Sequence, residues 1–120
     1  MNKRAINTYE DLPKWGILFL EMISNIKKGV ITIITPEGKY LKYSGIKEGE
    51  EVTIRINDWR FCEELFLKGD IGLGESYISG YWDCENINKL IQLGVENYKE
   101  LERVIKGSFL KIIFYRIKHI

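Results

Sequence analysis

Apolar residues change their spacing twice along this chain, and that change is the strongest constraint on its fold. They recur every three or four positions between residues 12 and 26, as on one face of a helix, and alternate between residues 51 and 57, as in a strand. Helical spacing returns after Asp58. A chain that passes from helical to strand spacing and back predicts an α+β fold, which we expect to be a small antiparallel sheet packed with helices.

The first half of the chain is expected to form one helix and three strands. Pro13 is tolerated in a first helical turn and Gly29 stands where glycine commonly follows a last turn, so the helix is expected between them. β-branched and aromatic residues around a Pro-Glu-Gly turn at 36–38 predict a hairpin over residues 30–45. A third strand is expected over residues 51–57.

Two further helices are predicted in the second half of the chain. The first follows Asp58, a suitable N-cap, and ends at Gly69. The second covers residues 87–95, where apolar residues return to helical spacing. Either Asn86 or Asn88 is suited to cap that second helix.

Charge is distributed unevenly, although the whole chain carries a net charge of only +1. Residues 1–47 carry +4, residues 48–102 carry −8 and residues 103–120 carry +5, with no acidic residue in the last range. Nucleic-acid-binding domains are usually basic as a whole, and the aromatic residues here are not interleaved with a basic stripe, so no nucleic-acid partner is expected. The basic C-terminal part is instead a first indication of an anionic surface as partner.

Several classes of protein are disfavoured by the cysteines and by the length of the apolar runs. Cys62 and Cys84 are too few and too far apart for a disulfide framework or a zinc site, so reduced thiols in the cytoplasm are expected. The N-terminus lacks the apolar run of a signal peptide, and the longest apolar runs are far shorter than the roughly 20 residues of a membrane-spanning helix. We therefore expect neither export nor a membrane span.

Residues 69–84, GDIGLGESYISGYWDC, are dense in glycine and aromatic residues. Gly69, Gly72 and Gly74 suggest a nucleotide-binding loop, but a dinucleotide fingerprint needs a further glycine where Tyr77 stands. A Walker loop would need Gly-Lys-Ser or Gly-Lys-Thr, which is also missing. The pattern therefore favours a structural turn over a phosphate cradle.

No catalytic residue and no metal ligand is predicted. Glu75 could be a buried carboxylate with a raised pKa or an ion-pairing residue that holds the loop; the second is favoured because the only histidine, His119, lies at the end of the chain. Cys62 lies on an apolar helix face and Cys84 has no base near it in sequence, so both are expected to be small buried residues.

A final helical segment is expected over residues 107–120, GSFLKIIFYRIKHI, which mixes apolar residues with cations. Lys111, Arg116 and Lys118 are candidate membrane contacts, because each cation near an anionic bilayer contributes about 1 kcal/mol of binding free energy. An apolar helix with cationic edges is equally suited to packing on a neighbouring domain, so both alternatives remain open.

The segment from Lys68 to Leu90, with the helix, hairpin and strand before it, resembles the N-terminal region of cyclopropane-fatty-acyl-phospholipid synthases. The resemblance extends from about Lys14 to Ile120 and is most specific in the run GLGESYISGYWD. The residues that fall on the family's glycine-rich signature are Gly69, Gly72, Gly74, Glu75, Tyr77, Gly80, Trp82 and Asp83.

This resemblance implies a lipid-binding domain similar to sterol-carrier folds over residues 1–106. Residues 107–120 would then lead to a catalytic domain that lies outside this sequence and uses S-adenosylmethionine to add a methylene group to unsaturated phospholipid acyl chains. No cofactor and no catalytic activity of its own is expected for this chain. Implied partners are a phospholipid surface at the inner face of the membrane and a catalytic domain in the same or another chain, with a homodimer also possible.

Within that resemblance the motif residues would have structural or lipid-contacting roles. Gly72 and Gly74 would permit a sharp turn, and Glu75 would tie the turn to neighbouring donors. Tyr77 and Trp82 would provide packing or lipid contact. A free-standing, non-enzymatic lipid-binding or interaction module is the alternative.

Overall fold

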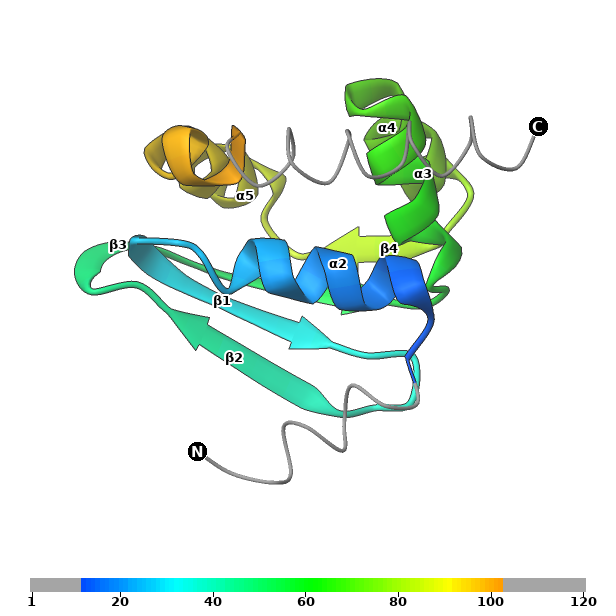
Figure 1. The fold of residues 1–120 in the computed structure, drawn as a ribbon, viewed down its shortest axis with the longest axis horizontal. Coiled ribbons are helices and arrows are strands. Elements are labelled where there is room, and N and C mark those ends of the chain that lie inside the picture. The colour runs from blue at the N-terminus through cyan, green and yellow to red at the C-terminus, as the bar shows by residue number, and fades with distance from the viewer. Residues whose placement is uncertain (1–11, 103–120) are drawn as a thin grey trace.

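A computed structural model describes residues 12–102 as a four-stranded sheet with helices packed on one face (Figure 1). The α+β class predicted from the sequence is therefore confirmed. The elements in chain order are α2 (Lys14–Ile23), β1 (Lys28–Ile34), β2 (Tyr40–Ser44), β3 (Lys47–Ile56), α3 (Arg60–Lys68), α4 (Asp70–Ile78), β4 (Trp82–Cys84) and α5 (Ile87–Glu96).

The sheet is mixed, so the expectation of an antiparallel sheet was wrong. Its strand order is β2-β1-β3-β4, in which β1 pairs antiparallel with β2 as the predicted hairpin, but parallel with β3. β4, a strand that the sequence did not indicate, adds an antiparallel edge to β3. Because β1 lies between β2 and β3, the chain must cross the start of β1 to pass from one to the other.

Gly45 makes that crossing possible. Its backbone N–H donates to Gly29 O at 2.8 Å, and the N–H of Lys47 donates to Lys27 O at 2.9 Å, so the link is bonded to the beginning of β1. A Cβ atom on Gly45 would overlap the backbone of Lys27. The physical reason for the parallel pairing is thus a glycine that permits two backbones to touch, a contact that strand periodicity does not reveal.

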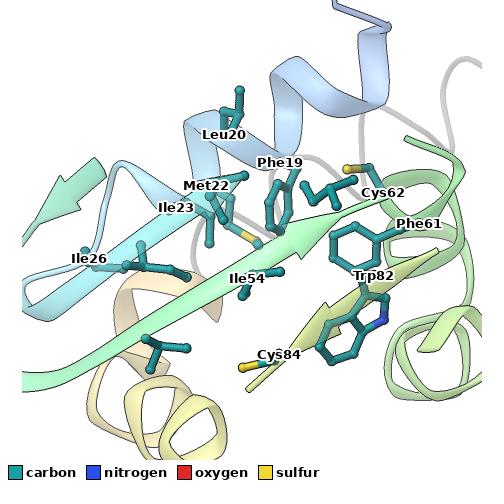
Figure 2. Packing of buried hydrophobic residues seen from close by; sticks show 14 of the residues in the cluster. Phe19, Leu20, Met22, Ile23, Ile26, Ile54, Phe61, Cys62, Trp82 and Cys84 are labelled. Carbon is teal, nitrogen blue, oxygen red and sulfur yellow. The ribbon is translucent and has the colours of Figure 1, made fainter. Parts of the chain in front are cut away.

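One apolar core lies between the sheet and the helices (Figure 2). In β3 the side chains of Val52, Ile54 and Ile56 are buried while those between them are exposed, as predicted for a half-buried strand. Phe19 of α2 meets Phe61 of α3 edge-on with ring centroids 5.1 Å apart. Fully burying a large apolar side chain contributes about 1.5–3 kcal/mol to folding. The apolar contacts between the helices and this face of the sheet therefore hold the two layers together.

Most of the predicted helix ends agree with the structure to within one or two residues. The helix α2 ends at Ile23, earlier than expected, because the side chains of Ser24 and Asn25 both donate to Glu21 O at 2.7 Å and close the last turn. The N-cap of α3 is Trp59, which makes no side-chain capping bond, so the prediction of Asp58 as N-cap was wrong by one residue. Asp58 stands just before it and accepts from the Arg60 N–H at 2.9 Å. For α5 the cap is Asn86, which accepts from the Lys89 N–H at 3.1 Å.

The segment predicted as a glycine-rich turn is instead helical, since α4 occupies most of it. Among residues 12–102 no helix has the length and apolar character needed to cross a bilayer. The predicted helical segment at 107–120, its boundary at residue 106, and the candidate contacts Lys111, Arg116 and Lys118 lie outside the described residues.

Candidate functional site

The motif residues come together in a unit formed by α3, α4 and β4. Gly72 lies where α4 crosses α3, and a Cβ atom there would overlap the carbonyl group of Glu64. Any other residue would force the two helices apart. Gly72 therefore sets the close packing of the helix pair rather than a sharp turn.

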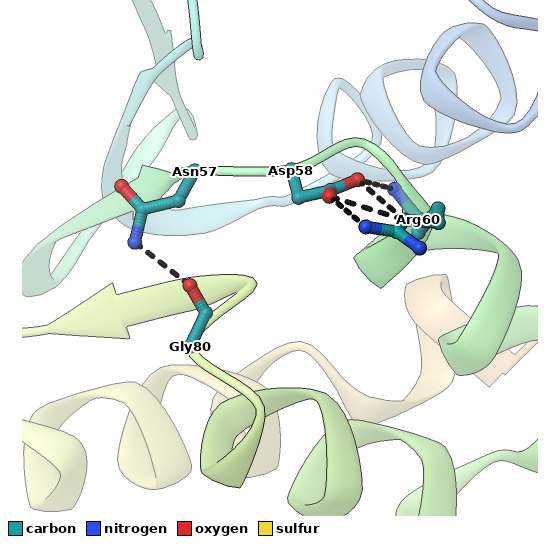
Figure 3. A network of polar contacts seen from close by, with 4 residues as sticks. All are labelled: Asn57, Asp58, Arg60 and Gly80. Carbon is teal, nitrogen blue, oxygen red and sulfur yellow. Dashed lines mark hydrogen bonds and ion pairs between the residues drawn. The ribbon is translucent and has the colours of Figure 1, made fainter.

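Gly80 connects α4 to β4 with a φ of +79°, a conformation that residues with a side chain rarely adopt. Its carbonyl oxygen accepts from Asn57 Nδ2 at 3.0 Å (Figure 3). Beside it the backbone N–H groups of Asn57 and Asp58 both donate to Tyr81 O. The turn after α4 is thereby bonded to the end of β3.

Asp58 and Arg60 form an ion pair at the same corner (Figure 3). Their closest atoms, Oδ2 and Nη2, are 2.7 Å apart, and hydrogen bonds from Arg60 lower the pKa of the Asp58 carboxyl. The Arg60 guanidinium also lies 4.8 Å from the centre of the Tyr81 ring. These contacts brace the start of α3 against the β4 turn, a structural role for charged groups.

Trp82 and Ser76 form the buried polar centre of the unit. The Trp82 indole Nε1 donates to Leu73 O and to Ser76 Oγ, both at 3.1 Å, and the Ser76 hydroxyl donates to Leu73 O at 3.0 Å. Trp82 is 4% exposed and Ser76 1% exposed. Of the two roles expected for Trp82, the structure places it in packing.

Tyr77 lies at the border of this core. Its ring centre is 5.0 Å from that of Trp82, yet 43% of the side chain is exposed. Asp83 on β4 is also exposed and accepts from the next residue's backbone, the Cys84 N–H, at 2.8 Å. Tyr77 is thus the motif aromatic that packs and is accessible at the same time.

Glu75 is exposed on α4, so its alternative as a buried carboxylate was wrong. Its Oε1 is 3.3 Å from Lys68 Nζ, which also lies 3.1 Å from a carboxylate oxygen of Glu64. These two acids, Glu64 first, raise the pKa of Lys68. The placement matches the ion-pairing role expected from sequence, with α3 as the neighbour.

Gly74 does not form the turn that was expected of it. It lies inside α4, exposed, with no atom within 4 Å of the position a Cβ would take. Glycine inside a helix costs roughly 0.5–1 kcal/mol relative to alanine. Nothing among the described residues explains why glycine stands here.

Both cysteines are buried, as predicted. Burial raises the pKa of the Cys62 thiol strongly and that of Cys84 to a lesser degree, so each stays protonated and unreactive. Within residues 12–102 no three His, Cys, Asp or Glu side chains cluster as metal ligands would. In the structure both thiols are packed residues of the apolar core.

Asn97 is a key residue that the sequence reasoning missed. It is fully buried, and its Oδ1 accepts from the backbone N–H groups of Lys27 at 2.8 Å and Lys28 at 3.0 Å. Its Nδ2 donates to Lys28 O at 3.0 Å and to Leu93 O at 2.9 Å. A signal was present, because Asn97 continues the helical spacing of the apolar residues Leu90 and Leu93.

Two exposed apolar surfaces remain on the helices. On α4, Ile71 and Ile78 are 69% and 86% exposed and lie on the same side as Gly74. On α5, Ile91 and Val95 are 60% and 64% exposed, and Tyr98 just beyond the helix is 63% exposed. Such side chains are available to a partner or a lipid surface.

The comparison with curated proteins gives two matches. Over 48 residues the chain is 35% identical to the cyclopropane-fatty-acyl-phospholipid synthase of Escherichia coli strain K12, and equally to that of Escherichia coli O6:H1. The aligned part makes up 37% of this chain and only 13% of each synthase. The chain is therefore distantly related to these synthases and spans a small part of their length.

No family model and no solved structure matches the chain. The sterol-carrier-like architecture thus stays a prediction, while the α+β class stands on the structure itself.

Proposed function

We propose that this chain is a lipid-engaging module that works with a methylene-transferring catalytic domain or chain. The observation that carries the proposal is the 35% identity to two cyclopropane-fatty-acyl-phospholipid synthases. Their name specifies phospholipid acyl chains as the substrate class. The described unit supports the division of labour, because its motif residues serve packing and surface contact.

In this proposal S-adenosylmethionine is bound by the catalytic partner. The described residues contribute a rigid platform, in which the α3–α4 pair and the turn at Gly80 are held by the contacts of Trp82 and Asn57. The partner could be a following domain or a separate polypeptide. The protein would work at the inner face of the membrane.

Charge assigns the lipid contact to the C-terminal part of the chain. Residues 12–102 contain eleven basic and fifteen acidic side chains and are therefore net acidic, whereas residues 103–120 carry +5. An anionic bilayer repels the first and attracts the second. Lys111, Arg116 and Lys118 are the proposed contacts.

Cosedimentation with lipid vesicles tests this proposal. The chain should bind vesicles that contain phosphatidylglycerol and not vesicles of pure phosphatidylcholine, and binding should weaken as salt rises. The triple variant Lys111→Glu, Arg116→Glu, Lys118→Glu should lose most of this binding. The matched control is Lys39→Glu, Lys42→Glu, Lys47→Glu, which makes the same charge change at exposed positions around β2 and should bind more than the first variant.

Equal loss in both triple variants would show that net charge alone, not the proposed contacts, determines binding. If the unaltered chain binds neither vesicle, the lipid proposal fails. The free-standing interaction module would then be the better description, with the exposed residues of α4 and α5 as its contact surface.

A further inference from the structure

The helix α5 has an apolar surface that the described fold leaves uncovered. Leu93 and Asn97 face the core, whereas Ile91 and Val95 lie one turn apart on another side of the helix and are about two-thirds exposed, as is Tyr98. We call Ile91, Val95 and Tyr98 the α5 stripe. Three large apolar side chains in one stripe, beside an already buried one, indicate that something covers it.

The charge around the stripe distinguishes the possible occupants. Residues 85–102 contain four acidic and two basic side chains. An anionic lipid surface would meet net negative charge there, and so would a second copy of the same face across a twofold axis. A basic, apolar segment has the complementary character.

Residues 107–120 of this chain have that character. They contain Phe109, Leu110, Ile112, Ile113, Phe114, Tyr115, Ile117 and Ile120 together with three of the five C-terminal cations, and no acid. They follow the stripe closely in sequence, and the 18 residues from 103 to 120 can span up to about 60 Å when extended, so the stripe is within reach. A tethered segment also has an effective concentration in the millimolar range, which favours it over free competitors.

We infer that residues 107–120 cover the α5 stripe in the free protein, with their apolar side chains on Ile91, Val95 and Tyr98. This contact does not depend on the proposed lipid function. Where both hold, the same apolar residues cannot lie on α5 and in a bilayer at once, so lipid binding would have to release the segment.

Thiol labelling of the full chain tests the contact without vesicles. Val95→Cys places a thiol in the stripe, and Gln92→Cys places one on an exposed polar part of the same helix as control. Native Cys62 and Cys84 are buried and react slowly. We expect Val95→Cys to react about tenfold more slowly than Gln92→Cys, which corresponds to a segment that is docked about 90% of the time.

Replacing apolar residues of the segment should remove this protection. In the Ile113→Asp, Ile117→Asp background, Val95→Cys should react as fast as Gln92→Cys. The control background Ser108→Asp, His119→Asp adds the same charge at polar positions and should retain most of the protection. Ile91→Cys provides a second reporter should Val95→Cys disturb the fold.

Three results would overturn the inference. Equal labelling of Val95→Cys and Gln92→Cys with the unaltered segment would show that the stripe is open. Protection that grows with protein concentration would identify a second copy as the occupant. Protection that appears only when phosphatidylglycerol vesicles are added would assign the stripe to lipid.

Discussion

Two glycines in one helix have opposite surroundings, and this contrast shows what single residues contribute. Gly72 touches the backbone of α3, whereas Gly74 faces open space two residues later. The sequence motif presents both as parts of one pattern. Spacing identifies such glycines but cannot say which of them faces a neighbouring backbone, because that neighbour comes from another helix.

The pair makes a direct prediction. Gly72→Ala should destabilise the protein by about 2–4 kcal/mol, because the helices must separate to admit a methyl group. Gly74→Ala should stabilise it by roughly 0.5–1 kcal/mol through helix propensity. Urea unfolding of both variants measures this, and equal effects would contradict the packing described for α4.

Burial of Cys62 predicts a dependence of stability on alkaline pH. Its pKa is raised in the folded state, so stability is fully present below the unfolded thiol's ordinary value of 9.0 and falls as pH rises above it. Above pH 9.0 the unfolded chain releases the Cys62 proton while the folded chain retains it. The unfolding free energy then decreases by about 1.4 kcal/mol per pH unit. Between pH 8.5 and 10.5 the unfolding free energy of the Cys62→Ala variant should therefore fall less steeply with pH, by up to about 1.4 kcal/mol per pH unit. An unchanged slope would show that other groups cause the fall.

At the scale of elements, the sequence predicted which segments are helices and strands better than how they pair. Alternation in β3 and helical spacing in α2, α3 and α5 are local properties, and each was confirmed. The parallel pairing of β1 with β3 depends on a backbone contact at Gly45, and β4 is a strand of only three residues. Neither feature leaves a periodic trace in the sequence.

Gly45→Ala should therefore disturb the sheet more than an ordinary loop substitution. The added methyl would push the link off the backbone of Lys27 and break the hydrogen bonds that cross the start of β1. We expect a loss of more than about 2 kcal/mol in unfolding free energy. Ser44→Ala, an exposed neighbour, should change it by less than about 0.5 kcal/mol. Similar losses of unfolding free energy in both variants would show that the link accommodates a methyl group at position 45.

At the scale of the whole molecule, Asn97 joins segments that are about 70 residues apart in sequence. It completes the hydrogen bonds at the start of β1 while anchoring the end of α5. Asn97→Ala should cost about 2–4 kcal/mol, since it leaves partly buried backbone groups of Lys27 and Lys28 without their amide partner. Asn88→Ala, an exposed position on the same helix, should be nearly neutral. Thermal unfolding compares them, and a small effect of Asn97→Ala would mean that water replaces the amide.

The Asn97 contact also bears on how the protein emerges from the ribosome. The chain is made from its N-terminus, so α2, the sheet and the α3–α4 pair are synthesised before the residue that bonds to the first strand. Until then the backbone N–H groups of Lys27 and Lys28, which Asn97 binds in the folded protein, can bind only water or a chaperone. A nascent chain halted before residue 97 should thus remain open to proteases at Lys27 and Lys28, and the protein would close only when α5 arrives.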